Sequence, residues 1–178
     1  NAYGDASVNL KYLITNTGIQ DGSRIFLGAG LIIPSNNVLT ENPFLEDQDG
    51  NALNEHRHFS LSDGCYKTNF EAQIYFKNNS KNIYIPSFYG LTVNYIKPLR
   101  DSKYGYLPGD TYIGIASILF PSKLKQNWAP KGISLGLAYL KTEKGFWNNE
   151  LAPNSESEVF IPSIGIIWNH KEYGSFSL

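Results

Sequence analysis

The feature that most constrains this chain is the alternation of apolar and polar side chains over segments of about ten residues. The clearest example runs from Asn69 to Phe76. A period of two places successive side chains on opposite faces of a β-strand. One face of this segment carries Phe70, Ala72, Ile74 and Phe76, and the other carries Asn69, Glu71, Gln73 and Tyr75. A soluble protein turns such an apolar face inward, whereas a membrane barrel turns it outward into lipid.

The same alternation predicts about eight strands. We expect them at residues 6–14, 24–33, 67–77, 85–96, 110–120, 132–141 and 159–169, with the last beginning at Tyr173. No segment of useful length has the 3.6-residue period of an amphipathic helix. The chain is therefore predicted to be all-β.

The connections between these strands alternate in length. Short polar turns are expected at 15–23, 78–84, 121–131 and 170–172, and longer connections at 34–66, 97–109 and 142–158. Short turns at one end and long loops at the other are typical of outer-membrane barrels, although soluble up-and-down barrels also show them. We predict an antiparallel up-and-down transmembrane β-barrel, with about eight strands in this chain and room for others in a larger barrel.

Composition limits the alternatives. The 178 residues suit one domain, and the net charge of −1 gives no basic field that would recruit nucleic acid. No apolar run is long enough for a transmembrane helix. The single Cys65 excludes an internal disulfide. We expect residues 1–178 to be one β-barrel domain that lacks its signal peptide, and whether terminal strands are also missing is left open.

Three short segments resemble a known family. Residues 24–34 read RIFLGAGLIIP, residues 58–64 read HFSLSDG, and residues 104–110 read YGYLPGD. These segments resemble the "GAG-x-x-x-P" strand, a membrane re-entry segment and the "Y-x-P-G-D" strand entry of transporter-like outer-membrane proteins of the phenol meta-pathway type. The resemblance implies the outer membrane of a Gram-negative bacterium and a role in transport. It implies no catalytic residues.

The longest loop contains residue types that bind metals. His56 and His58 could bind zinc together with a carboxylate, and Asp47 and Asp49 could contribute oxygen ligands to calcium. Neither set has the spacing of a recognised zinc or EF-hand motif. An ordinary polar loop is the favoured interpretation, so we predict no metal and no cofactor.

The same loop offers the residue types of a serine hydrolase. Ser60 and Ser62 lie near His58, with Glu55 and Asp63 as carboxylates. No GxSxG motif accompanies them, and any serine-rich loop would supply similar residues. We predict that the protein is not an enzyme.

Aromatic residues concentrate near the expected strand ends, where a membrane barrel carries its two aromatic girdles. In a soluble barrel they would instead pack in the core. These residues are Tyr66, Phe88, Tyr89, Tyr95, Tyr104, Tyr106, Phe120, Trp128, Phe146, Trp147 and Trp168.

These patterns predict two sets of strand residues with different surroundings. The lipid-facing candidates are Phe70, Ala72, Ile74, Phe76, Leu135 and Leu137, and the lumen-facing candidates are Lys11, Asn69, Glu71, Gln73, Thr92 and Asn94. The expected function is passive, porin-like transport, or the barrel component of a membrane complex with other subunits. Membrane lipid is the expected partner, and nucleic acid is not. The alternatives are a soluble ligand-binding barrel and a structural subunit that assembles at the cell surface through its edge strands.

Overall fold

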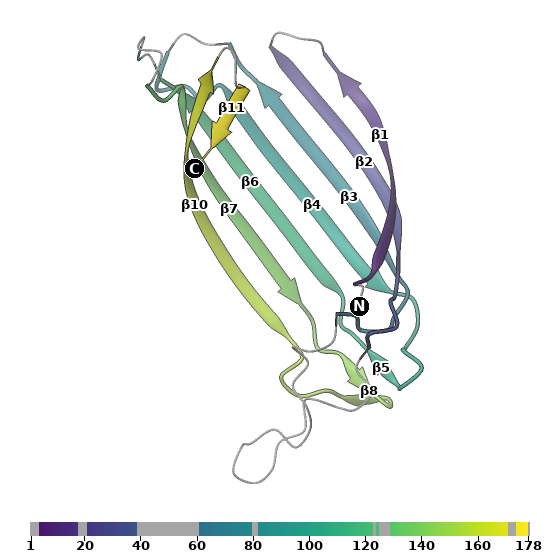
Figure 1. Cartoon of the computed structure of the whole chain (residues 1–178). Helices are drawn as coiled ribbons and strands as arrows, with labels where there is room; N and C mark the ends of the chain where they lie inside the picture. Colours follow the sequence, from purple (N-terminus) through teal and green to yellow (C-terminus); the bar gives the residue numbers. More distant parts are fainter. Residues whose placement is uncertain are drawn as a thin grey trace, which may run out of the picture.

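The computed structural model describes residues 4–17, 21–38, 61–79, 82–122, 124, 129–170 and 174–177. Figure 1 shows one large, strongly tilted antiparallel sheet, with a small second sheet at one end. The large sheet has eight strands in the order β1-β2-β3-β4-β6-β7-β10-β11. If the two-residue strands of the small sheet are set aside, each strand pairs with the strands before and after it in the sequence. This is the up-and-down arrangement that the alternation predicts.

All eight expected strands are present, and their bounds differ from the prediction by a few residues. The strands are β1 (Ala6–Asn16), β2 (Gly22–Ile33), β3 (Lys67–Lys77), β4 (Phe88–Pro98), β6 (Thr111–Pro121), β7 (Gly132–Thr142), β10 (Ser157–His170) and β11 (Gly174–Ser177). The all-β prediction is therefore confirmed. Among the described residues, no helix is long and apolar enough to cross a membrane.

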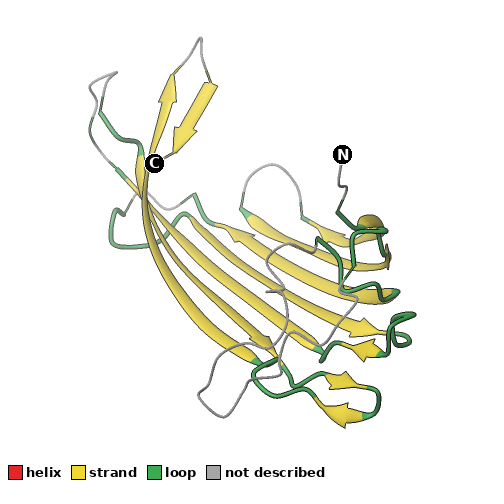
Figure 2. Cartoon of the chain, turned by 60° about the horizontal axis from the view of Figure 1, so that its bottom comes forward, coloured by secondary structure: helices red, strands yellow, loops and turns green. Residues whose placement is uncertain are grey.

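The sheet is curved like a trough, with a concave and a convex face (Figure 2). Its glycines indicate which face is which. A Cβ atom added to Gly30 would lie 2.1 Å from Asn9 Oδ1, and one added to Gly136 would lie 2.5 Å from Ser163 Oγ. A Cβ added to Gly114, which has the opposite orientation, would meet nothing within 4 Å. Side chains therefore crowd together on the concave face and spread apart on the convex face, as in the wall of a small barrel.

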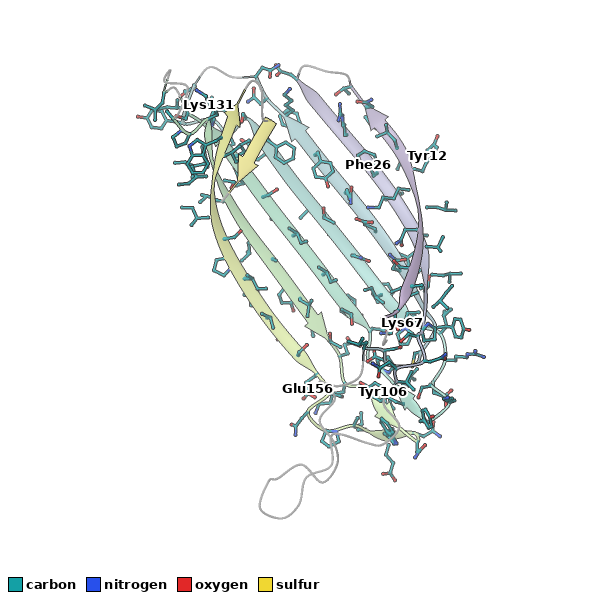
Figure 3. All side chains as sticks on the ribbon, in the orientation of Figure 1. Tyr12, Phe26, Lys67, Tyr106, Lys131 and Glu156 are labelled. Carbon is teal, nitrogen blue, oxygen red and sulfur yellow. The ribbon has the colours of Figure 1, made fainter. Side chains whose placement is uncertain are left out.

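Labelled side chains show the same division. Tyr12 projects outward from the curved sheet, whereas Phe26 lies over its inner face (Figure 3). In the register, Tyr12 is paired with Leu27. Leu27 is in turn paired with Ala72, so one row of apolar side chains continues across three strands on the convex face.

Long connections meet at one end of the sheet and form the second sheet there (Figure 1). It consists of β5 (Tyr106–Leu107), β8 (Phe146–Trp147) and β9 (Glu150–Leu151), in that order. The alternation does not reveal these strands, because two residues are too few to show a period. The sequence does contain one local indication of them, the pair Asn148-Asn149. These residues form the two-residue turn between β8 and β9, with φ values of 50° and 68°, and asparagine is favoured in such turns.

The predicted closed barrel is not found among the described residues. In the described part of the chain, β1 pairs only with β2, and β11 pairs only with β10. The sheet is open along the outer edge of β1 and along the part of β10 before Ile167. Pro162 in β10 fits an edge strand, because proline has no N–H to donate to a further partner.

Candidate functional site: the two faces of the curved sheet

All six lipid-facing candidates lie on the convex face. Phe70, Ala72, Ile74 and Phe76 alternate along β3. Leu135 and Leu137 take equivalent positions on β7, where they pair with Ile118 and Ala116 of β6. The five large side chains are 42% to 52% exposed, and Ala72 is half-buried. These residues form an exposed apolar surface and do not fill a core.

Hydrogen-bonded tyrosines lie at the long-loop end of the convex face. Tyr95 and Tyr112 stack with ring centroids 5.1 Å apart, and the Tyr95 hydroxyl donates to the Asp110 carboxylate. The Tyr139 hydroxyl donates to Glu158 Oε1 over 3.0 Å. Each of these two hydroxyls has an acidic partner near the strand end, while the rings continue the apolar surface. Tyrosine takes this position where an apolar and an aqueous region meet.

The opposite end of the convex face also carries rings. Phe76 and Tyr89 lie with centroids 6.1 Å apart. Phe120 of β6 and Trp168 of β10 also lie on the convex face, because each has the parity of the other convex residues of its strand. Between these ends most convex side chains are aliphatic or small, and Tyr12 of β1 is an exception.

All six lumen-facing candidates lie on the concave face. Together with Asn9 they form what we call the polar cluster: Asn9, Lys11, Asn69, Glu71, Gln73, Thr92 and Asn94. Its side chains come from three strands, β1, β3 and β4. They meet across β2 because Gly28 and Gly30 lie between the side chains of β1 and β3 in the register.

Glu71 and Lys11 form an ion pair across β2. The Lys11 Nζ atom lies 2.8 Å from Glu71 Oε2, and Gln73 donates to the other carboxylate oxygen. Gly28 lies directly between the two charged residues, and a Cβ there would be 3.2 Å from Lys11 Cγ. The glycine therefore leaves the space in which the two side chains meet.

Removal of Lys11 is expected to cost more stability than removal of the Glu71 charge. The Glu71 side chain is only 14% exposed, whereas that of Lys11 is 44% exposed and can reach water alone. Lys11→Met should therefore lower the free energy of unfolding by about 1–3 kcal/mol, and Glu71→Gln by less than about 1 kcal/mol. Urea unfolding of both variants measures the difference, and equal losses would contradict this account of the pair.

Two amide oxygens in the polar cluster lack hydrogen-bond partners. Asn69 Oδ1 and Asn94 Oδ1 are both buried, and neither accepts a hydrogen bond from any described residue. Asn69 as a whole is 8% exposed. Its oxygen lies over Gly30, because a Cβ on that glycine would be 2.5 Å away. Such an unsatisfied acceptor costs free energy and points to a missing partner.

An aromatic cluster adjoins the polar cluster on the same face. The Phe26 ring lies edge-on to Tyr75 with ring centroids 6.2 Å apart, and Tyr75 stacks on Phe88 with ring centroids 5.7 Å apart. The prediction that Phe88 belongs to an outer girdle is therefore wrong, because Phe88 shares the parity of Thr92 and Asn94 along β4 and its side chain faces inward. Sequence reasoning missed the cluster, although Phe26 and Tyr75 share the parity of the polar residues.

The concave face changes character across the sheet. One register row passes from Glu71 through Asn94 to Ile113, and then to Leu140 and Val159. Ile115, Val159 and Ile161 are exposed on this inner face, at 43% to 55%. The concave face is thus polar over β1–β4 and aliphatic over β6, β7 and β10. The predicted lumen-facing residues do not include this aliphatic part.

Most of the described buried apolar residues lie at the long-loop end and not in the large sheet, and Ala129, between β6 and β7, is the exception. Tyr106, Trp147 and Ala152 pack together there, and Cys65 is fully buried. The Cys65 thiol donates to the backbone oxygen of Tyr106 over 3.2 Å. Tyr106 and Trp147 are therefore core residues of the small sheet, and the prediction of a girdle position for them is wrong.

Burial makes Cys65 unreactive in the folded protein. Desolvation, followed by the charge of Asp63, raises the pKa of the thiol to about 12 from 9.0. Because the folded pKa is the higher one, the thiol's contribution to stability is present below pH 9.0 and is lost as the pH rises toward 12. We expect iodoacetamide at about pH 8 to leave Cys65 unmodified until urea is added, as mass spectrometry would show. Rapid alkylation of the folded protein would contradict the buried position.

Two adjoining hollows flank the loop at residues 99–103. Their volumes are about 490 and 620 Å³, and both are lined by Arg100 and Asp101. The Arg100 guanidinium lies 4.7 Å from the centre of the Tyr66 ring, and Lys103 lies 4.8 Å from that of Tyr104. In the larger hollow the formal charges of Arg100 and Asp101 cancel, whereas the smaller one, which Lys103 also lines, has one net positive charge.

Most candidates for metal binding and hydrolysis lie outside the described residues: Asp47, Asp49, Glu55, His56, His58 and Ser60. Of the others, Ser62 accepts a hydrogen bond from Gly64 N over 3.0 Å, and Asp63 pairs with Lys67. In the part of the chain that the structure describes, no group of three or more His, Cys, Asp or Glu residues could hold a metal ion.

Comparisons with known proteins add no family. No protein-family model, no curated protein and no solved structure matches the chain. The resemblance to transporter-like outer-membrane proteins therefore stays a prediction based on three short segments.

Proposed function

We propose that this chain forms the wall of a transmembrane β-barrel in the outer membrane of a Gram-negative bacterium. In this proposal the convex face contacts lipid and the concave face lines a passive path for a solute. The observation that carries the proposal is the continuous, exposed apolar surface of the convex face. Leu10, Leu31, Phe70 and Ile164, on four different strands, are 52% to 80% exposed. Soluble monomers rarely expose an apolar patch of this extent.

Strand length supports the proposal. The six long strands from β1 to β7 have 11 or 12 residues, and β10 has 14. A tilted strand needs about 9–11 residues to cross the hydrocarbon region of a bilayer. The tyrosines at the long-loop end would then lie at the membrane surface, with the Asp110 and Glu158 partners of Tyr95 and Tyr139 in water.

The open edges set a condition for the proposal. In lipid, unpaired backbone N–H and C=O groups each cost several kcal/mol, so only a closed barrel is stable there. The edges of β1 and β10 must therefore pair with each other or with further strands when the sheet enters a membrane. A closed barrel of eight strands is largely filled by its own side chains, so a wide path would require additional strands.

Insertion into vesicles tests the proposal. The urea-denatured chain is diluted into phosphatidylcholine vesicles and, in parallel, into buffer without lipid or detergent. We expect it to float with the vesicles after an alkaline wash, and to aggregate in buffer. A monodisperse, folded protein in buffer that does not float with vesicles would contradict the membrane assignment.

A second candidate function rests on the edges themselves. Among the described residues no strand pairs with the outer edge of β1, and such an edge can accept a strand from another molecule. The chain would then act as a structural subunit that assembles with copies of itself or with other subunits. A soluble oligomer in the buffer arm of the vesicle experiment, with a rise in β-structure, would favour this function.

A further inference from the structure

We propose that the polar cluster and the adjoining aromatic cluster form a binding site for a neutral, polyhydroxylated solute such as a short oligosaccharide. The two clusters share the concave face of β1–β4, and the register places them next to each other. Gln73 of the polar cluster pairs with Phe26 of the aromatic cluster, and Tyr75 follows two residues later. The site uses residues of four neighbouring strands and does not include the loops.

The hydrogen-bonding groups match adjacent hydroxyls. Each sugar hydroxyl donates one hydrogen bond and accepts others. The amides of Asn69 and Asn94, the Glu71 carboxylate and the Lys11 ammonium offer both acceptors and donors within one patch. The carboxylate already accepts from Lys11 and Gln73, so it is held in place before a ligand arrives.

The unpartnered amide oxygens are the second, independent observation. Asn69 Oδ1 and Asn94 Oδ1 are buried without partners, which is costly in the ligand-free state. The terminal torsion of asparagine is broad, so each amide can turn toward a ligand at low cost. A bound hydroxyl would then supply the missing donor, and binding would relieve the penalty.

The aromatic cluster provides the apolar part of the site. Sugar rings have one face of C–H groups, and such a face packs on aromatic side chains. Phe26, Tyr75 and Phe88 are half-buried and form a continuous set of rings beside the amides. Aromatic rings combined with a few placed polar groups are typical of small-molecule sites.

Charge argues for a neutral ligand. Lys11 and Glu71 are the two charged members of the polar cluster, and their formal charges cancel, so this cluster has no net charge to select an ion. Arg24 and Lys77 lie at the border of the aromatic cluster, where the register pairs them with Tyr75 and Phe88. A hydrocarbon would desolvate the amides and the ion pair without replacing their hydrogen bonds, which is unfavourable. A polyol offers hydroxyl groups that form new hydrogen bonds to these amides and charges.

Titration calorimetry with three neutral trisaccharides, maltotriose, cellotriose and raffinose, tests the site. The full chain is held in lauryldimethylamine oxide, because this detergent has no sugar head group. We expect saturable binding of at least one trisaccharide in the millimolar range, and none of trigalacturonate or of polyethylene glycol of similar mass. Absence of saturable binding by all three sugars would overturn the proposal and leave ordered water as the partner of the two amides.

A matched set of variants separates a binding site from a structural role. Asn94→Leu removes a buried amide oxygen that has no partner, so it should weaken trisaccharide binding at least about tenfold without lowering the unfolding midpoint. Glu71→Gln should weaken binding by a similar factor. Ile115→Val, on the aliphatic part of the same face, should leave binding unchanged. Unaltered binding by both Asn94→Leu and Glu71→Gln would contradict the proposal.

The site is independent of the membrane assignment. Binding of a trisaccharide by a protein that does not float with vesicles would support the site and contradict the transmembrane barrel. Flotation with vesicles without trisaccharide binding would support the transmembrane barrel and contradict the binding site.

Discussion

Replacement of Leu91 by arginine is expected to lower the free energy of unfolding in a lipid bilayer by about 2–4 kcal/mol. Leu91 is 45% exposed near the middle of the convex face, between Ile74 of β3 and Ala116 of β6. At this depth a guanidinium must leave water or deform the bilayer around it. Urea unfolding from phosphatidylcholine vesicles, followed by tryptophan fluorescence, measures the loss.

Thr92→Arg is the matched control, because Thr92 is the next residue of β4 and faces the concave side. There it pairs with Gln73 and Ile115 in the register. We expect a loss of less than about 1 kcal/mol, since a polar inner face accommodates a charged side chain. In a soluble protein the substitution at the exposed Leu91 would change stability by only about 0.5 kcal/mol. Such a small effect at Leu91 would contradict lipid contact.

Gly109→Ala is expected to disrupt the long-loop end and to lower the free energy of unfolding by about 2–3 kcal/mol. A Cβ at this position would lie 2.0 Å from the backbone oxygen of Glu143 and 2.4 Å from its carbonyl carbon. These are backbone atoms, so the connections that carry β5 and β8 would have to separate. The hydrogen bond from Glu143 N to Asp110 O, now 2.9 Å, would be strained by the same movement.

Gly114→Ala provides the control for the same substitution. Gly114 lies on the convex face of β6, and an added Cβ would meet nothing within 4 Å. We expect no loss, or a gain of up to about 1 kcal/mol, because alanine has fewer conformations than glycine in the unfolded chain. Thermal unfolding of both variants compares the two sites. Equal effects would show that the close backbone approach at Gly109 is not present.

The main strands follow from the sequence because each is long enough to show a period of two. Phe70 to Phe76 on β3 and Ile133 to Tyr139 on β7 alternate without interruption. The turns between strands are read from their polar residues. The pairing order then follows from short connections, since consecutive antiparallel strands usually lie side by side.

Other features depend on tertiary contacts that local patterns do not encode. The small sheet places Tyr106 against Trp147, about 40 residues away in sequence, with ring centroids 5.3 Å apart. Neither of these two sequence segments contains a local pattern that predicts its contact with the other. Phe88 is a different case, because its parity with Thr92 and Asn94 already places it on the inner face, and its position near the strand end gave the wrong prediction.

The candidate site was predicted in part. Parity along β3 and β4 identifies Asn69, Glu71 and Asn94 as members of one face. Parity does not reveal that Gly28 lets Lys11 reach Glu71, because that contact crosses three strands. Nor does it reveal the two amide oxygens without partners, since burial depends on the curvature of the whole sheet.

The orientation of the sheet in a bilayer is the central claim, and a spin-label scan along β4 tests it most directly. Single cysteines at positions 91, 92, 93 and 94, in a Cys65→Ala background, are labelled and reconstituted into phosphatidylcholine vesicles. Collisions with oxygen, which concentrates in lipid, should be more frequent at 91 and 93 than at 92 and 94, and collisions with a water-soluble nickel chelate should show the opposite order. High nickel accessibility at 91 and 93 would contradict a lipid-facing convex surface.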